Sequence, residues 1–305
     1  MDTQKNYSGV LYALAAYLSW GVLPLYWKIL ARIDALQILS SRVVFSLLFV
    51  WILLAFKKKP LWPRLLADTK RLRALLLSAL LISANWGLYI WAVNSGHTVQ
   101  ASLGYYINPL FNVLLGLLFF KERLPAVQWI AFALALGGII LLTLFSGVFP
   151  WISFILALTF GLYGLAKKTV AVDSLEALGS ETLMMTPFAL GILFWQGSQG
   201  TGAFSISPLF SLLLVASGIV TAIPLFAFAQ GAKRLPLSTL GFIQFVSPTL
   251  QLIMGVLLFK EPFPARNLIA FALVWSGLIL YVLSGFGLNT LFAPKSHPSA
   301  GTNLR

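Results

Sequence analysis

Two charged residues lie inside apolar stretches of the sequence and are the first candidates for chemistry. Arg42 stands in "ILSSRVVFS" and Glu181 stands in "LGSETLMMT". A charge at the centre of a bilayer costs roughly 2.5–3.5 kcal/mol on insertion scales, so such groups usually face a cavity or a partner. We expect Arg42 to orient an anionic substrate group or to gate one side, and Glu181 to support coupling or gating. The alternative for both is snorkelling to the nearer headgroups.

A second candidate constellation consists of polar residues that repeat along two segments. They form two sets of three, each spaced i, i+3 and i+7 so that it shares one helical face: Tyr105, Asn108 and Asn112, and Gln244, Ser247 and Gln251. A shift of 139 residues maps the first set onto the second. We expect these six side chains to line a central cavity with Trp86 and Tyr89 nearby. The alternative is that the amides only bond neighbouring helices, at about 0.6 kcal/mol each on average.

Other reactive chemistry finds little support in the sequence. The eight carboxylates show no catalytic pairing, and no phosphate-binding loop, GxSxG or HExxH motif occurs. Cysteine is absent, and the two histidines, His97 and His297, cannot form a histidine-rich metal site. We therefore predict that the chain is not an enzyme and uses no cofactor or metal.

The composition places these residues in membrane helices. The chain is 59% hydrophobic and 10% charged, with a mean hydropathy of +0.89, which is far from soluble globular usage. The charge-free run from residue 74 to residue 120 is about twice as long as a single span needs. We predict an all-α polytopic membrane protein with ten spans, at 7–27, 36–56, 74–94, 98–120, 125–146, 148–166, 175–195, 208–232, 236–259 and 264–286.

The chain also contains an internal duplication. "FKERLPA" at 120–126 returns as "FKEPFPA" at 259–265, and the 139-residue match runs from Asn108 to Leu142. This predicts a first repeat at 1–146, a second at 147–290 and a cytoplasmic tail at 291–305. Five is an odd number of spans, so the second repeat enters the membrane from the opposite side. Inverted repeats are typical of alternating-access transporters.

The distribution of charge predicts the orientation. The net charge is +13, but most Lys and Arg fall in alternate loops, with a dense segment at 57–73. The positive-inside rule then places both termini in the cytoplasm. This pattern explains the basic charge without nucleic acid, so the expected partners are a small-molecule substrate and the lipid bilayer, with a homodimer possible.

Four motifs carry a resemblance to a known group. They are "NWGLYIWAVN" at 85–94, "ASLGYYINPL" at 101–110, "GLYGLAKK" at 161–168 and "STLGFIQFVSPTL" at 238–250. Together they resemble the RarD group of EamA-domain transporters, in the drug/metabolite transporter superfamily. The resemblance implies ten helices in two EamA repeats, residence in a bacterial inner membrane, and efflux or exchange of small organic metabolites or drugs. The alternative is a channel-like or non-transporting integral membrane interaction protein.

Overall fold

The fold is described from a computed structural model, which covers residues 3–57, 69–95, 97–147, 149–169, 172–258, 260 and 264–285. Throughout these ranges the regular elements are helices, so the predicted all-α class is confirmed. Glu261 and the predicted tail at 291–305 lie outside the described residues, as does most of the basic segment at 57–73.

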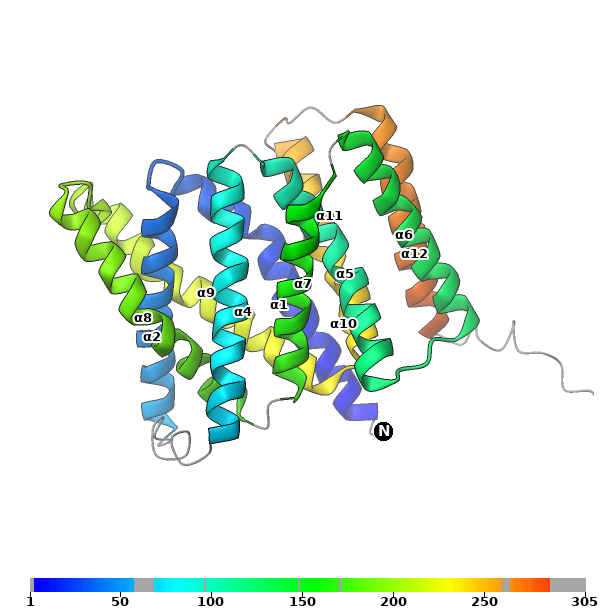
Figure 1. Cartoon of the computed structure of the whole chain (residues 1–305), viewed down its shortest axis with the longest axis horizontal. Coiled ribbons are helices and arrows are strands. Elements are labelled where there is room, and N and C mark those ends of the chain that lie inside the picture. The colour runs from blue at the N-terminus through cyan, green and yellow to red at the C-terminus, as the bar shows by residue number, and fades with distance from the viewer. Residues whose placement is uncertain are drawn as a thin grey trace, which may run out of the picture. The chain divides into compact units, whose positions relative to one another are not determined.

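The helices follow the predicted spans closely (Figure 1). In chain order they are α1 (Thr3–Ile29), α2 (Ala35–Phe56), α4 (Thr69–Asn94), α5 (Thr98–Phe120), α6 (Ala126–Ser146), α7 (Trp151–Thr169), α8 (Ser174–Ser198), η1 (Ala203–Ser205), α9 (Pro208–Arg234), α10 (Leu237–Gln244), α11 (Val246–Ile253), η2 (Met254–Leu258) and α12 (Ala265–Gly285).

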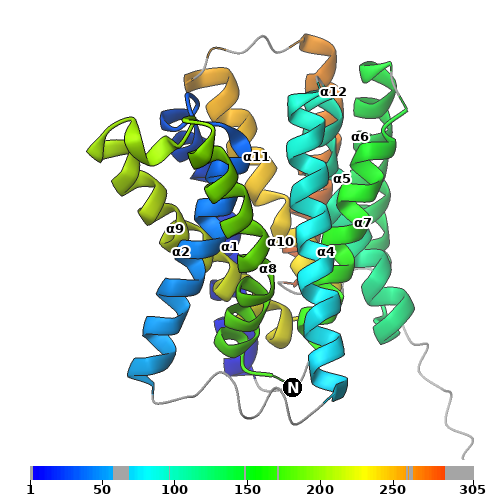
Figure 2. The same cartoon turned by 60° about the vertical axis from the view of Figure 1, so that its left-hand side comes forward.

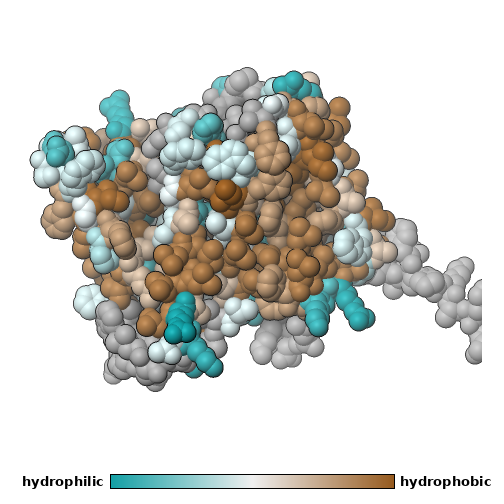
Figure 3. Space-filling view, viewed as in Figure 1, coloured by the Kyte–Doolittle hydropathy of each residue, from teal (hydrophilic) through white to brown (hydrophobic). Residues whose placement is uncertain are grey.

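Most of these helices are long and apolar enough to cross a membrane. Within the described ranges nine stretches meet that standard, with α10, α11 and η2 counted as one stretch from Leu237 to Leu258. The nineteen-residue helix α7, which carries Lys167 and Lys168 in its last turn, completes the ten predicted spans. Figure 3 shows hydrophobic side chains over the flanks of the helices and hydrophilic ones near the helix ends. The chain is a multi-pass helical membrane protein.

The chain divides into two compact units, each with helices from both halves of the sequence. Unit 1 comprises residues 1–122 and 146–263, and unit 2 comprises residues 123–145 and 264–305. Within unit 2, α6 and α12 approach closely because two glycines lack side chains. A Cβ atom at Gly138 would lie 2.5 Å from the Ala270 carbonyl oxygen, and one at Gly277 would lie 2.6 Å from that of Ala131. These two glycines are 139 residues apart, as the duplication requires.

In unit 1, α5 and the α10–α11 segment run antiparallel, which is the relation that an inverted repeat requires. Three contacts at successive levels establish the direction. A Cβ atom at Gly116 would lie 3.1 Å from the Ser238 nitrogen. Asn112 then hydrogen-bonds Gln244, and Tyr106 bonds the Pro248 carbonyl oxygen. Figure 2 shows the same segment, with α10 and α11 at different heights in the unit.

The duplicated FKE motif ends both of these helices in the same rare conformation. Lys121 and Lys260 have φ values of 51° and 58°, in the left-handed region that residues with a Cβ seldom adopt. Glu122 then folds back, and its carboxylate accepts bonds from the backbone nitrogens of Leu237, at 2.7 Å, and Ser238, at 2.9 Å. These are the first orphan N–H groups of α10, so the carboxylate caps that helix.

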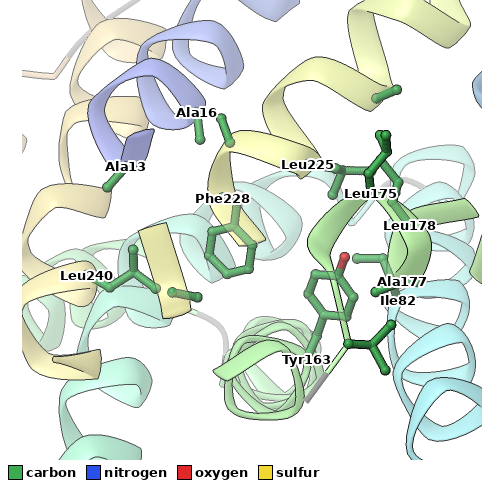
Figure 4. Close-up of a cluster of buried hydrophobic side chains, with 14 of the residues drawn as sticks. Ala13, Ala16, Ile82, Tyr163, Leu175, Ala177, Leu178, Leu225, Phe228 and Leu240 are labelled. Atoms are coloured by element: carbon green, nitrogen blue, oxygen red, sulfur yellow. The ribbon is translucent and has the colours of Figure 1, made fainter. Parts of the chain in front are cut away.

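A hydrophobic core holds the helices of unit 1 together (Figure 4). At its centre the rings of Tyr163, from α7, and Phe228, from α9, stack with centroids 5.9 Å apart and an interplanar angle of 10°. Both side chains are fully buried. Small residues of α1, among them Ala13 and Ala16, let that helix pack closely against α9 and α10. This core fixes the helices whose other faces line the candidate site.

Candidate functional site

Unit 1 encloses a cavity of about 310 Å³ between helices of both predicted repeats. Its wall reaches from Tyr17, halfway along α1, to Ala35, at the start of α2. The cavity therefore extends towards the end of the unit at which α1 stops and α2 starts. Small-molecule sites occupy roughly 300–1,000 Å³, so this volume suits a compact organic molecule.

The cavity gathers most of the residues that the sequence singled out. Eight of the ten predicted site residues line it: Arg42, Trp86, Tyr89, Tyr105, Asn108, Gln244, Ser247 and Gln251. The two exceptions are Asn112 and Glu181. Asn112 is fully buried and lies behind the cavity wall, and Glu181 belongs to a separate cluster.

The polar faces of α5 and α10–α11 are joined directly. Asn112 Nδ2 donates to Gln244 Oε1 at 2.6 Å, and the Tyr17 hydroxyl donates to the same oxygen at 3.4 Å. Gln251 Nε2 donates to the Trp20 carbonyl oxygen at 3.1 Å. These bonds hold the amides in fixed orientations at the cavity wall.

Asn108 differs from its neighbours on this face. Its side chain is 4% exposed and borders the cavity, yet its Oδ1 atom has no hydrogen-bond partner among the described residues. A buried polar atom without a partner is costly, typically by about 1–3 kcal/mol. The Asn108 Oδ1 atom is therefore an unpartnered acceptor at the cavity wall.

Arg42 enters the cavity from α2 in an aromatic setting. Its guanidinium carbon lies 4.7 Å from the ring centroid of Trp27 and 4.9 Å from that of Trp86. Its Nε atom donates to the Thr221 hydroxyl at 2.9 Å. Across the described ranges no Asp or Glu pairs with Arg42, so its terminal nitrogens remain available for another acceptor. Aromatic rings stabilise a cation without neutralising it.

Further aromatic side chains complete the wall. The rings of Tyr89 and Tyr105 meet edge to face with centroids 5.8 Å apart, and Tyr17 and Trp20 meet similarly at 5.6 Å. Such pairs hold their rings in preferred mutual orientations. The cavity therefore combines planar apolar surface, several neutral amides and one arginine.

Glu181 lies in a different place, between α8, α7 and α4. Its Oε1 atom is 2.6 Å from Lys167 Nζ, and both side chains are almost fully buried. Ser78 donates to the same oxygen at 2.5 Å, and the Tyr163 hydroxyl donates to Oε2 at 3.4 Å. The carboxylate is therefore neutralised and hydrogen-bonded within the protein, and it does not contact Arg42.

Several residues at these two sites were not among the predicted ones. Trp27 is the last residue of the predicted first span, a place typical of tryptophans at the membrane interface, but it packs over Arg42. Asn85 lines the cavity and is held by the Leu156 carbonyl oxygen and the Thr159 hydroxyl. The predicted span ended at residue 166, which placed Lys167 in a loop. Helix α7 runs on to Thr169 and carries Lys167 into the interior.

Comparison with known proteins places this architecture in a family. The profile described as the EamA-like transporter family matches residues 7–144 and 149–283. An uncharacterized transporter of Pseudomonas aeruginosa is 46% identical over 284 residues, covering 92% of this chain and 95% of that protein. Protein RarD of Streptomyces exfoliatus is 43% identical over 275 residues, covering 90% and 87%. A protein of known crystal structure has the same fold, with a TM-score of 0.71. It is 19% identical in sequence, and the superposition covers 91% of this chain and 98% of that chain.

Proposed function

Because the chain belongs to the EamA-like transporter family, we propose that it is a secondary active transporter of small organic metabolites or drugs. It acts as an exporter or exchanger in a bacterial inner membrane and works by alternating access. The observation that carries this proposal is the cavity bounded by the antiparallel helices α5 and α10–α11. Inverted repeats place binding sites at the repeat interface and exchange conformations around them.

The fourth helix of the second repeat is less regular than its counterpart α5, which supports a moving element at this site. The α10–α11 segment tightens at Phe245, whose nitrogen bonds the Phe242 carbonyl oxygen, and it ends in the π-helical turn η2, whereas α5 is one continuous α-helix. Irregular turns inside membrane helices are frequent at functional sites. Pro109 and Pro248, which are equivalent in the two repeats, lie close to this tightened turn on facing helices. The two copies of one sequence thus differ in conformation next to the cavity, as alternating access requires of the two halves of a carrier.

The candidate residues take separate roles in this proposal. Arg42 orients an anionic group of the cargo in the cavity, because its terminal nitrogens lack an acidic partner among the described residues. Glu181 gates the opposite end of unit 1 through Lys167, because the ion pair ties α8 to α7. Asn112 positions Gln244, and the remaining predicted residues contact the cargo.

The proposed orientation places both termini in the cytoplasm. It rests on the distribution of Lys and Arg among the loops. The cavity then extends towards the periplasm, since it reaches the start of α2. A reporter fused to the C-terminus tests this orientation: activity of a cytoplasmic reporter is expected, and activity of a periplasmic reporter would overturn it.

Cysteine accessibility tests alternating access without knowledge of the cargo. The chain contains no cysteine, so Ser247→Cys creates a single reporter in the cavity wall. A membrane-impermeant thiol reagent should label it in both right-side-out and inside-out vesicles, and planar bilayers should show no unitary currents. Labelling from one side only would indicate a non-transporting protein, and unitary currents would indicate a channel.

A further inference from the structure

Arg42 and Glu181, the two charges that the sequence predicts inside the membrane, are treated differently by the protein. Glu181 has an internal counterion, Lys167, at 2.6 Å. Arg42 has two tryptophan rings and one hydroxyl but no acid among the described residues. A buried charge is stable when it is paired or faces water or a ligand. The chain therefore leaves one positive charge uncompensated, and it does so at a cavity.

The charge of the cavity wall restricts the cargo. Among the described lining residues Arg42 alone carries a formal charge, and none is an acid. An ammonium group would meet a like charge without a carboxylate to pair with. Arg42 would neutralise only one charge of a group with two negative charges. It would fully neutralise a group with a single negative charge.

The geometry around Arg42 favours a carboxylate. The Nε atom is already bonded to Thr221, and Trp27 and Trp86 pack against the guanidinium. The remaining N–H groups belong to the two terminal nitrogens, which form the parallel pair that binds a carboxylate through both oxygens. The rings limit how the guanidinium can turn, so the carboxylate binds at a fixed edge.

The other residues that line the cavity indicate the chemistry of the uncharged part of the cargo. The rings of Trp86, Tyr89 and Tyr105 supply planar apolar surface, and the Asn108 Oδ1 atom needs a hydrogen-bond donor. The volume of about 310 Å³ lies at the small end of the range for small-molecule sites.

We infer that the cargo is a compact organic monocarboxylate with a planar apolar body and at least one hydroxyl or N–H donor. This inference rests on the proposed transport function and specifies its substrate class. The carboxylate pairs with Arg42, the donor bonds Asn108, and the aromatic wall packs on the body of the molecule. Cationic, zwitterionic and doubly negative molecules of the same size bind weakly.

Ligand binding to the purified full-length protein tests this class directly. The probes are para-hydroxyphenylacetate, its amide, tyramine, tyrosine and para-hydroxyphenyl phosphate, which share one ring and hydroxyl but differ in charge. Isothermal titration and thermal stabilisation should detect the carboxylate above the other four, because a ligand selective for the folded state raises its stability. Phenylacetate, which lacks the donor, should bind more weakly than para-hydroxyphenylacetate.

Variants of Arg42 test whether this residue is responsible for binding the carboxylate. Arg42→Gln should weaken binding of para-hydroxyphenylacetate about tenfold to a hundredfold, since charge-assisted hydrogen bonds are the strong ones. Arg42→Lys should retain part of it, and Arg123→Gln, at an exposed position outside the cavity, should change nothing. If Arg42→Gln does not fold, the five-probe ranking and Arg42→Lys still decide the question.

The inference and the proposed function fail in different ways. Preference for tyramine or tyrosine, carboxylate binding that ignores Arg42, or no binding of either carboxylate would overturn the substrate class. Labelling of Ser247→Cys from both sides of the membrane would leave the transporter proposal standing in each of these cases. One-sided labelling together with Arg42-dependent carboxylate binding would overturn the transporter and retain the anion site.

Discussion

Arg42 and Glu181 occupy equivalent positions in the two repeats, since the 139-residue shift maps one onto the other. Each lies in the second helix of its own EamA match and hydrogen-bonds a hydroxyl on the third helix of the other match: Thr221 on α9 for Arg42, and Ser78 on α4 for Glu181. The difference comes from the first helix. With a one-residue gap between the first and second helices, the first helices align at a shift of 140 residues. Aligning "GVLPLYWK" at 21–28 with "GLYGLAKK" at 161–168 then sets Trp27 opposite Lys167.

In our proposal, that single difference separates a closed ion pair from a binding site. Lys167 neutralises Glu181, whereas Trp27 covers a face of Arg42 and leaves its charge in place. The two repeats thus place different groups at equivalent positions. One position holds a closed ion pair, and the other holds an arginine that borders a cavity. The comparison predicts opposite responses to mutation at the two sites.

The largest expected effect is at the closed site. Lys167→Met leaves Glu181 buried and unpaired, which should destabilise the protein by about 3–5 kcal/mol in detergent unfolding. The double variant Lys167→Met with Glu181→Leu should recover most of that loss, because two apolar groups replace the pair. Lys57→Met, at an exposed residue, is the control. A Lys167→Met variant as stable as the wild type would contradict the buried ion pair between Lys167 and Glu181.

Asn112 and Gln251 occupy equivalent positions in the fourth helices of the two repeats, and their variants should differ in effect. Asn112→Leu removes the 2.6 Å bond to Gln244 and should cost about 1–3 kcal/mol of stability. Gln251→Leu, at the equivalent position in the second repeat, changes a cavity residue and should mainly reduce transport. Unfolding midpoints and flux of both variants check this. Equal stability losses would show that the two positions share one role.

The cap on α10 should have a smaller effect. Glu122→Gln keeps the shape of the side chain but removes its charge from the helix N-terminus, which should cost about 1 kcal/mol. Arg123→Gln, one residue away and exposed, should cost nothing measurable. A larger loss for the control than for Glu122→Gln would show that the loop, not the cap, matters.

Arg42 should show the smallest change in stability. Arg42→Met loses two cation–π contacts, at about 0.5–1 kcal/mol each, and one hydrogen bond of about 1 kcal/mol. It also removes a membrane charge that costs roughly 2.5–3.5 kcal/mol. The two contributions nearly cancel, so the unfolding free energy should shift by less than about 1 kcal/mol. A loss as large as that of Lys167→Met would make Arg42 structural.

The sequence allowed the helices and the shared polar face to be predicted because both follow from periodicity. Charge-free runs define the spans, and the i, i+3, i+7 spacing puts Asn108 on a face with Tyr105, as the cavity shows. The same spacing could not show that Asn112 lies one turn beyond the cavity. That depends on how deeply α10 packs against α5, which Gly241 sets: its Cβ would lie 2.5 Å from the Pro109 carbonyl oxygen.

The partners of the buried charges could not be predicted from the sequence. Lys167 precedes another lysine at the end of a span, so its pairing with Glu181 depends on where α7 ends and how it packs on α8. Trp27 was equally ambiguous, because a tryptophan near a span end fits an interfacial belt as well as a cavity wall. Side-chain direction is a property of the packed helices, and only the structure gives it.

Counterflow through reconstituted vesicles tests the central claim most directly, namely that Arg42 binds an anionic cargo in an alternating-access carrier. Vesicles preloaded with unlabelled para-hydroxyphenylacetate receive a trace of the labelled compound outside. Wild-type protein should take up label several times faster than in empty vesicles, and Arg42→Gln should abolish that acceleration while remaining folded. Uptake that is indifferent to preloading, or acceleration that survives Arg42→Gln, would contradict the account.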